Sequence, residues 1–315
     1  MTQDKTAIAV VGSGLMGHSI AQVLALAGHR VAVHDADAAA LASVPARVQR
    51  NLGELVRWGM VDAADAAATV ARLSLSSDLP TTVTGAEFVF EAIWENLAAK
   101  RQLFGELDRL CLPETILASN SSSLMPSLLQ SDAEHPERIL VAHFFNPPYL
   151  VPLVEVVKGA RTSDDTVNRV YELLVRAGRT PVLVRKEVPG FLANRMQLAL
   201  VREAIHLVEE GVASPEDVDL AVQAGFGRRF CVAGPMGVTE SIGWDLAVAV
   251  LNTTFPSLDN RMTAGSLAEG LIERGELGMK TGRGLLRWTD ESVEAWRSRM
   301  ARALVELERN EAFRP

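Results

Sequence analysis

Short apolar runs alternate with longer amphipathic stretches in the first part of the chain. Residues 7–11 form a β-branched run ending at Gly12, an apolar helical pattern follows to about residue 27, and residues 30–34 form a second strand-like run. The alternation continues with predicted strands at 88–92, 116–118, 139–143, 151–157 and 182–185 and predicted helices at 37–58, 62–72, 100–110 and 164–177. This order predicts an α/β domain with a doubly wound, mostly parallel sheet.

The pattern changes at Val188-Pro189-Gly190. Only helical periodicity follows, at 191–210, 215–224, 238–251, 265–274 and 292–311. We therefore expect an α/β domain over residues 1–187 and an all-helical domain over 188–315. A chain of 315 residues is long enough for two cores, because single cores stop growing near about 250–300 residues.

Composition and charge narrow the class of protein. With 48% hydrophobic and 22% charged residues, the chain has the make-up of a soluble globular enzyme. Its net charge of −8 argues against nucleic acid or an anionic membrane as a partner. It has no signal peptide pattern and no run of about 18 apolar residues, and Cys111 and Cys231 lack metal or redox spacing. We expect a cytoplasmic protein without a metal site.

The first turn carries a dinucleotide-binding pattern, Gly12-Ser13-Gly14-Leu15-Met16-Gly17. Gly12 permits the tight turn, Gly14 lets the backbone approach a pyrophosphate, and Gly17 lets helix and strand pack closely. The helix N-terminus offers free N–H groups to the phosphates, so Leu15 and Met16 are also predicted to bind the cofactor. Glycines in turns are often only turns, but the strand before and the helix after favour a Rossmann-type cofactor site.

Asp35 stands at the end of the second predicted strand. Its carboxylate can accept hydrogen bonds from both ribose hydroxyls and would repel a 2′-phosphate, which favours NAD over NADP. Asp37 adds negative charge. The alternative interpretation is that Asp35 caps the helix that follows.

His143 and Glu155 lie in two apolar runs separated by Pro147-Pro148. Adjacent strands joined by this turn would bring the two side chains together. A carboxylate behind a histidine fixes its tautomer and raises its basicity, which suits a proton-abstracting base. With the cofactor motif, the pair predicts an alcohol dehydrogenase in which a nicotinamide takes the hydride. The other histidines have no better claim and are expected to be structural.

Further motifs follow in order along nearly the whole chain. They are Glu91-Ala92-Ile93-Trp94-Glu95-Asn96-Leu97, Ser119-Asn120-Ser121-Ser122-Ser123, His143-Phe144-Phe145-Asn146-Pro147, Pro189-Gly190-Phe191-Leu192-Ala193-Asn194-Arg195 and Leu277-Gly278-Met279-Lys280-Thr281-Gly282-Arg283-Gly284. Together with the glycine turn, they resemble the 3-hydroxyacyl-CoA dehydrogenase superfamily. The resemblance also implies a homodimer formed through the helical domain.

The resemblance implies a role for each matching residue. His143 would be the catalytic base and Glu155 its orienting partner, while Ser122 and Asn194 would hold the substrate oxygen. The residues that would contact NAD are Glu95, Lys100, Asn146 and Lys280. Simpler alternatives remain, since Ser122 could only stabilise its turn, Asn194 could only start a helix, and both lysines could be solvated surface charges.

Two departures from the family pattern bear on the substrate. CoA-using members carry a serine and, two turns later, a lysine at positions that hold Asn51 and Trp58 here, although Arg50 and Arg57 lie nearby. A tryptophan cannot offer a cation to a phosphate, so the CoA interpretation is weakened.

The second departure is the segment Ala224-Gly225-Phe226-Gly227-Arg228-Arg229-Phe230. The lambda-crystallin (L-gulonate 3-dehydrogenase) and carnitine dehydrogenase branch places an arginine and an aromatic there. Arg229 directly precedes the aromatic residue and would bind a substrate carboxylate bidentately, and a surface salt bridge is the alternative. Phe144-Phe145 and Lys280-Thr281-Gly282 resemble the CoA-using branch instead.

We therefore expect NAD-dependent oxidation of a small free L-3-hydroxy acid to the 3-keto acid. The first alternative keeps the chemistry but uses an L-3-hydroxyacyl-CoA, such as 3-hydroxybutyryl-CoA. The second alternative is an NAD-binding, crystallin-like structural protein without turnover. The complete set of His143, Glu155, Ser122 and Asn194 favours an enzyme.

Overall fold

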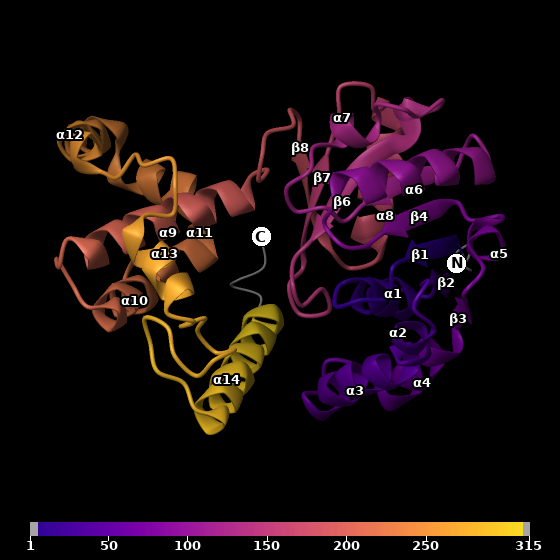
Figure 1. Cartoon of the computed structure of the whole chain (residues 1–315), viewed down its shortest axis with the longest axis horizontal. Helices are drawn as coiled ribbons and strands as arrows, with labels where there is room; N and C mark the ends of the chain where they lie inside the picture. The colour runs from indigo at the N-terminus through magenta and orange to yellow at the C-terminus, as the bar shows by residue number, and fades with distance from the viewer. Residues whose placement is uncertain (1–5, 311–315) are drawn as a thin grey trace. The chain divides into compact units, whose positions relative to one another are not determined.

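The computed structural model describes residues 6–310 and divides the chain into two compact units, one ending at Arg195 and one beginning at Met196 (Figure 1). The sequence pattern places the boundary slightly earlier, after residue 187. Within the described part of the chain, no helix is both long and apolar enough to cross a membrane.

The first unit is built on one eight-stranded sheet. Its strands are β1 (Ala7–Val11), β2 (Arg30–His34), β3 (Leu73–Ser76), β4 (Phe88–Glu91), β5 (Ile116–Ser119), β6 (Ile139–Phe144), β7 (Leu153–Val157) and β8 (Thr180–Val184), in the spatial order β3-β2-β1-β4-β5-β6-β7-β8. Neighbouring strands are parallel except β6 and β7. The strand order reverses between β1 and β4, and doubly wound sheets bind ligands at the carboxyl ends of the strands beside such a point.

The strands at the centre of the sheet are formed by the segments with continuous apolar sequence. All residues of β4, β5 and β6 are buried, as expected of strands covered on both faces. The rings of Phe90 and Phe144 meet edge to face across this core, with centroids 6.0 Å apart. Strand β3 was not predicted, because it lies at the sheet edge and its Leu-Ser-Leu-Ser sequence is only partly buried.

The sheet is accompanied by helices of the same unit (Figure 1). They are α1 (Gly17–Leu26), α2 (Ala38–Ala42), α3 (Val44–Arg57), α4 (Ala63–Ala71), α5 (Leu79–Val83), α6 (Leu97–Leu110), α7 (Pro126–Leu129) and α8 (Asp164–Arg176), with a 3-10 turn at Pro136–Arg138. The single helix predicted at 37–58 is two helices, because Pro45 in the first turn of α3 has no N–H to continue α2.

The second unit is helical, as predicted. Its helices are α9 (Ala193–Glu209, which begins in the first unit), α10 (Pro215–Ala224), α11 (Phe226–Ile242), α12 (Trp244–Thr254), α13 (Ser266–Glu273) and α14 (Asp290–Arg309), with a 3-10 turn at Phe255–Ser257. The helix predicted at 238–251 is divided at Gly243, whose φ of +92° ends α11. Residue 311, the last of the predicted helix 292–311, lies outside the described residues.

Candidate active site

His143 and Glu155 stand directly opposite each other on the antiparallel pair β6 and β7. The imidazole Nδ1 lies 2.8 Å from Glu155 Oε2, and the two residues are 5% and 1% exposed. The other carboxylate oxygen, Oε1, accepts the backbone N–H groups of Leu192 and Ala193, each at 2.8 Å. Burial raises the pKa of Glu155, but the hydrogen bonds from His143 and these two amides outweigh it and hold the pKa below its usual range. An ionised carboxylate only accepts, so Nδ1 donates and Nε2 is left to take a proton.

Two aromatic rings fix the plane of the His143 imidazole. The Phe145 ring lies 4.5 Å away and the Phe191 ring 5.8 Å away, measured between centroids. Phe191 is fully buried and has a φ of +51°, a left-handed conformation that is strained for a bulky residue. Sequence reasoning did not assign Phe191 a role, although it noted the Pro-Gly-Phe motif.

Ser122 and Asn194 come together in the structure. Ser122 follows the carboxyl end of β5, next to β6, and the Asn194 side-chain amide donates to its backbone oxygen at 3.3 Å. Asn120 ties this segment to β6, because its Oδ1 accepts the N–H of Phe144 at 2.8 Å. Ser122 and His143 therefore lie near the carboxyl ends of the adjacent strands β5 and β6.

The glycine turn has the close contacts that its sequence predicts. At Gly12 (φ +98°) a Cβ would lie 2.6 Å from the Ala92 carbonyl carbon, and at Gly17 it would lie 1.7 Å from the Gly12 oxygen. A Cβ at Gly14 would meet nothing within 4 Å, so this face of the turn is open for a ligand. Leu15 is 66% exposed at the same turn. These features fit a pyrophosphate lying against the turn.

Asp35 is held beside the glycine turn. Its Oδ2 accepts from the Ser13 N–H at 2.6 Å and from Ser13 Oγ at 2.8 Å, and its Oδ1 accepts from the Asp37 N–H. Burial raises the pKa of Asp35, but these donors outweigh it and keep the pKa low. The residue that caps α2 is Asp37, not Asp35. A cavity of about 470 Å³ is lined by Asp35, Gly12 and Trp94, among others, and gives room for part of a dinucleotide.

Lys100 faces the interior. Its side chain is 1% exposed, and Nζ lies 2.6 Å from Glu91 Oε1 and 3.5 Å from Glu95 Oε2. Burial raises the pKa of Glu91, while the Lys100 ammonium and the hydroxyl of Ser119 oppose that rise. Glu95 Oε1 accepts the backbone N–H of Ser122 at 3.1 Å. Sequence reasoning quoted Glu91 in a motif but gave it no role, because the pattern does not show that its side chain is buried against Lys100.

The other predicted contacts are spread more widely. Asn146 is exposed and follows β6, and Lys280 and Arg229 are exposed on the second unit, in the segment after α13 and on α11. Their predicted roles toward NAD and a substrate carboxylate stay predictions.

Asn51 does not face a substrate. It is 6% exposed, and its side-chain amide donates to Gln22 Oε1 at 3.0 Å and lies 3.5 Å from His18 Nε2. It therefore joins α3 to α1. Trp58, at the end of α3, is half-buried, whereas Arg57 is exposed.

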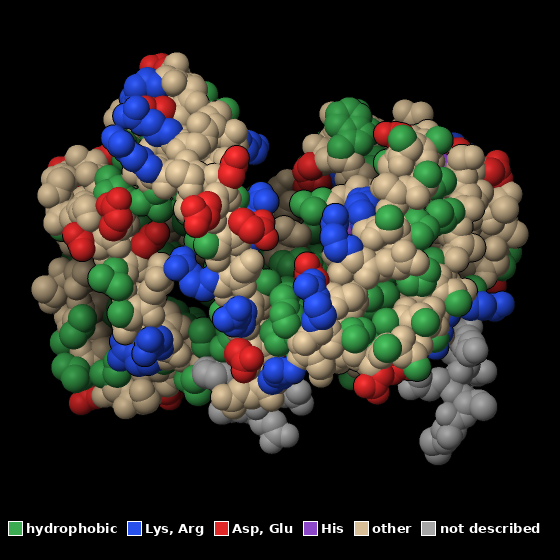
Figure 2. Space-filling model, turned by 90° about the horizontal axis from the view of Figure 1, so that it is seen from below, with side chains coloured by type: hydrophobic (Ala, Val, Ile, Leu, Met, Phe, Trp, Pro, Cys, Tyr) green, Lys and Arg blue, Asp and Glu red, His purple; other side chains and the backbone are tan. Residues whose placement is uncertain are grey.

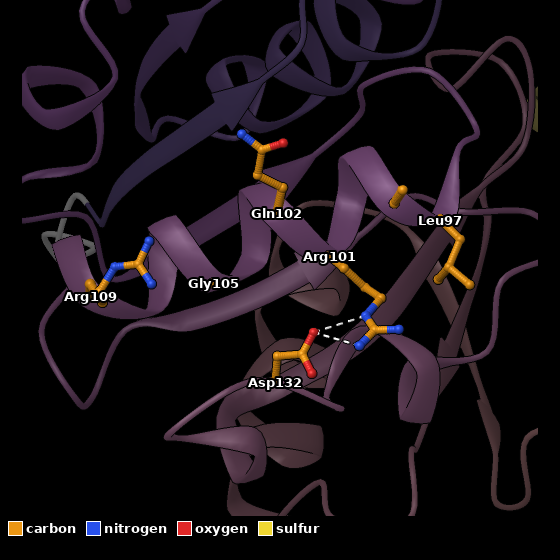
Figure 3. A pocket seen from close by; sticks show the side chains of 7 residues that line it. Leu97, Arg101, Gln102, Gly105, Arg109 and Asp132 are labelled. Carbon is orange, nitrogen blue, oxygen red and sulfur yellow. Dashed lines mark hydrogen bonds and ion pairs between the residues drawn. The ribbon is translucent and has the colours of Figure 1, made fainter.

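A hollow of about 670 Å³ lies elsewhere, along α6 (Figure 3). Leu97, Arg101, Gly105 and Arg109 line it, and the Arg101 guanidinium is engaged by Asp132, with Nε 3.0 Å from Oδ2. It is larger than the cavity beside Asp35 but contains none of the residues predicted to act in catalysis. Within residues 6–310 no group of three or more His, Cys, Asp or Glu side chains is placed to hold a metal ion.

Comparison with known proteins identifies two family domains. Residues 7–188 match the model of the 3-hydroxyacyl-CoA dehydrogenase NAD binding domain, and residues 190–288 match that of its C-terminal domain. These matches confirm the resemblance seen in the sequence, the NAD cofactor and the fold class.

Individual relatives cover most of the chain. A 5-formyl-3-hydroxy-2-methylpyridine 4-carboxylate 5-dehydrogenase of Mesorhizobium japonicum is 34% identical over 96% of this chain and 97% of its own length. A lambda-crystallin homolog of Bos taurus is 42% identical (73% and 72% covered), and a probable 3-hydroxybutyryl-CoA dehydrogenase of Bacillus subtilis is 35% identical (90% and 98% covered). A crystal structure of the pyridine carboxylate 5-dehydrogenase, an NAD+-dependent dismutase, superposes with a TM-score of 0.89 at 33% identity, covering 97% of this chain and 98% of that one.

Proposed function

Because this chain belongs to the 3-hydroxyacyl-CoA dehydrogenase family and is an NAD-dependent oxidoreductase, we propose that it oxidises the 3-hydroxyl of a small free L-3-hydroxy acid to the ketone. The observation that carries the proposal is the buried His143–Glu155 pair, with Nδ1 and Oε2 2.8 Å apart. An imidazole held in this tautomer is a base with one free nitrogen.

His143 Nε2 takes the hydroxyl proton as the carbonyl forms, and Glu155 stabilises the imidazolium that results. Bound NAD supplies the acceptor for the hydride that leaves carbon 3. Ser122 and Asn194 hold the substrate oxygen, and Asp35 binds the adenosine ribose. Glu95, Asn146 and Lys280 contact the cofactor. Holding the hydroxyl between base and hydride acceptor supplies the geometry that the reaction needs.

The free acid is preferred over a CoA thioester for two reasons. Asn51 occupies the position of a CoA-contacting serine, yet its amide is buried between α1 and α3. The Mesorhizobium relative, which matches 96% of this chain against 90% for the 3-hydroxybutyryl-CoA dehydrogenase, acts, by its name, on a small pyridine carboxylate. We propose that Arg229 binds the substrate carboxylate, since a guanidinium can hold it bidentately.

A CoA thioester is the second candidate, and the similarity to the 3-hydroxybutyryl-CoA dehydrogenase favours it. The test is NADH formation with L-3-hydroxybutyryl-CoA, L-gulonate, L-carnitine and L-3-hydroxybutyrate in parallel, and analysis of the products with the pyridine aldehyde carboxylate, because a dismutation forms no net NADH. Turnover of a free acid alone supports the proposal, and turnover of the thioester alone refutes it. NADH binding without turnover of any substrate would favour the structural-protein alternative.

Two neighbouring arginines, Arg228 and Arg229, allow a test of the proposed carboxylate-binding residue against a matched control. Arg229→Gln is expected to raise KM for the free acid by about 10-fold or more, the loss expected for a charged hydrogen bond, and Arg228→Gln is expected to leave it nearly unchanged. Equal effects of the two substitutions would contradict a specific anchor at Arg229.

We also propose a homodimer formed by the second unit. Apolar side chains are exposed on its helices, among them Leu246 (56%) and Val250 (56%) on α12 and Leu198 (61%) on α9. Figure 2 shows hydrophobic side chains lying between charged ones on one face of the molecule. A light-scattering mass of one chain would refute the dimer.

The free thiols of Cys111 and Cys231 suit a reducing compartment, and we place the protein in the cytoplasm on that ground.

A further inference from the structure

A buried hydrogen-bond network begins at Glu91, the last residue of β4. This side chain is 0% exposed and accepts three donors: Lys100 Nζ at 2.6 Å, Ser119 Oγ at 2.5 Å and the Ile93 N–H at 2.7 Å. A buried ion pair is often no more stabilising than apolar residues of the same volume. The effect of the Glu91–Lys100 pair is therefore expected in the positions of the residues that it holds, more than in the stability of the fold.

One branch of the network leads to residues 121–123, which we name the serine turn. Lys100 Nζ lies 3.5 Å from Glu95 Oε2. The other oxygen of Glu95, Oε1, accepts four hydrogen bonds from the turn: Ser121 Oγ at 2.6 Å, Ser122 N–H at 3.1 Å, Ser123 N–H at 3.1 Å and Ser123 Oγ at 2.9 Å. The place of Ser122 thus depends on Glu95, and that of Glu95 on Lys100.

The other branch leads to the glycine turn. Glu91 Oε1 holds the Ile93 N–H, and the backbone at Ala92 and Ile93 lies against Gly12. The fit is so close that a Cβ on Gly12 would lie 2.6 Å from Ala92 C and 2.8 Å from Ile93 N. A shift of this backbone would therefore move the surface that supports the cofactor turn.

We propose that Glu91 and Lys100 are positioning residues that set the serine turn and the glycine turn in one arrangement. Both side chains are buried, at 0% and 1% exposed, so each acts through the neighbours that it holds in place. The cofactor contact that the family resemblance implies for Lys100 stays a prediction. The part of the inference that concerns Ser122 rests on the proposed function, whereas the part that concerns the glycine turn does not.

The test compares two buried carboxylates of the same unit. Glu91→Gln keeps the size of the side chain and removes its charge. The control is Asp108→Asn on α6, the helix that also carries Lys100; Asp108 pairs with Arg138 at 2.7 Å, and both side chains are almost fully buried. We expect Glu91→Gln to raise the Kd for NADH and lower kcat, each by about 10-fold or more, because small misplacements in a site have effects of this size. Asp108→Asn should lower the melting temperature similarly and change both constants by less than about threefold.

A second variant separates positioning from stability. Glu91→Gln combined with Lys100→Met removes both charges, so the melting temperature should recover while the Kd for NADH and kcat do not. In a cycle with Ser122→Ala, the effects of Glu91→Gln and Ser122→Ala on kcat should be non-additive, whereas Asp108→Asn and Ser122→Ala should add.

Two results would overturn the proposal. One is recovery of NADH affinity together with the melting temperature in the double variant. The other is a Glu91→Gln enzyme whose Kd and kcat match those of Asp108→Asn. Should the wild-type protein oxidise none of the offered acids, the proposed function fails, and the NADH titrations still decide the role of Glu91.

Discussion

Replacing Glu155 by glutamine makes the hydrogen bonds on its two carboxylate oxygens compete for a single amide oxygen. The carboxylate accepts from His143 Nδ1 through one oxygen and from the N–H groups of Leu192 and Ala193 through the other, all at 2.8 Å. A glutamine has a single oxygen and an NH2 group that donates. It can therefore satisfy the two backbone amides or the imidazole N–H, but not both.

The cost of each unmade hydrogen bond decides whether the glutamine oxygen faces the His143 imidazole or the two backbone amides. If the amide oxygen faced His143, two backbone N–H groups would meet the NH2 group, at a cost of about 1–3 kcal/mol for each unsatisfied donor. If the oxygen faces Leu192 and Ala193, the imidazole only has to exchange its tautomer, which costs much less. We expect the second arrangement, with the proton on Nε2 and no free nitrogen for the substrate hydroxyl. Forcing the wrong tautomer on a serine-protease histidine lowers kcat by about 10⁴, and we expect a loss of about 10³–10⁴ here.

The assay is kcat at saturating NAD and substrate, with the Kd for NADH as a check that the cofactor site is intact. Glu187→Gln is the matched control, because its carboxylate also accepts a backbone N–H, from Ser127 at 2.9 Å. It should leave kcat within about threefold, as expected of a side chain outside the site. A Glu155→Gln enzyme with kcat within about tenfold of the wild type would refute the tautomer argument.

The same variant predicts a change in acid stability. The folded-state pKa of Glu155 lies below its ordinary value of 4.5, so its contribution to the free energy of unfolding is complete above that pH. The contribution is lost as the pH falls through the lower folded-state pKa. Glu155→Gln should therefore be less stable than the wild type near pH 7, and the difference should shrink at low pH. A constant difference across an acid titration would contradict this sign.

Three further predictions follow from separate contacts. Asp35→Asn should raise KM for NAD by about 10-fold or more and reduce the preference for NAD over NADP, because it removes a charged acceptor; an unchanged ratio of the two KM values would argue against a ribose contact. Gly17→Ala places a Cβ 1.7 Å from a backbone oxygen and should abolish NADH binding, whereas Gly53→Ala, in open space on α3, should stabilise by about 0.5–1 kcal/mol in thermal melts. Burial raises the pKa of Cys111 to about 11, so at pH 8 a thiol reagent should modify exposed Cys231 first, and equal labelling rates would be inconsistent with this burial.

Local contacts account for the parts of the site that could be predicted from the sequence. His143 and Glu155 are close in the chain and belong to neighbouring antiparallel strands, so the alternation of apolar residues was enough to bring them together. The glycine turn and Asp35 follow likewise from one strand–helix–strand unit. The places of the inner strands along the chain could be predicted from their continuous apolar runs, which the edge strand β3 lacks.

The parts that could not be predicted depend on which way a side chain faces. Asn51 stands where CoA-using members of the family carry a serine, and the sequence alone does not show that the helix turns it toward Gln22. For Lys100 the sequence left a solvated surface charge as the alternative, and its burial against Glu91 shows that this alternative is wrong. The left-handed conformation of Phe191 gives no pattern in the chain, because it is imposed by surrounding packing.

The direct opposition of His143 and Glu155 on their two strands has a consequence for how this protein can evolve. The geometry of the pair is set by the ladder of β6 and β7, in which Val141 faces Val157 and Phe144 faces Val154. The register is carried by this ladder, so the part of the connecting loop beyond Phe145 and Asn146, residues 147–152, can change in sequence while the base and its carboxylate stay in place. Sequence changes there can accumulate without disturbing the proton-transfer pair.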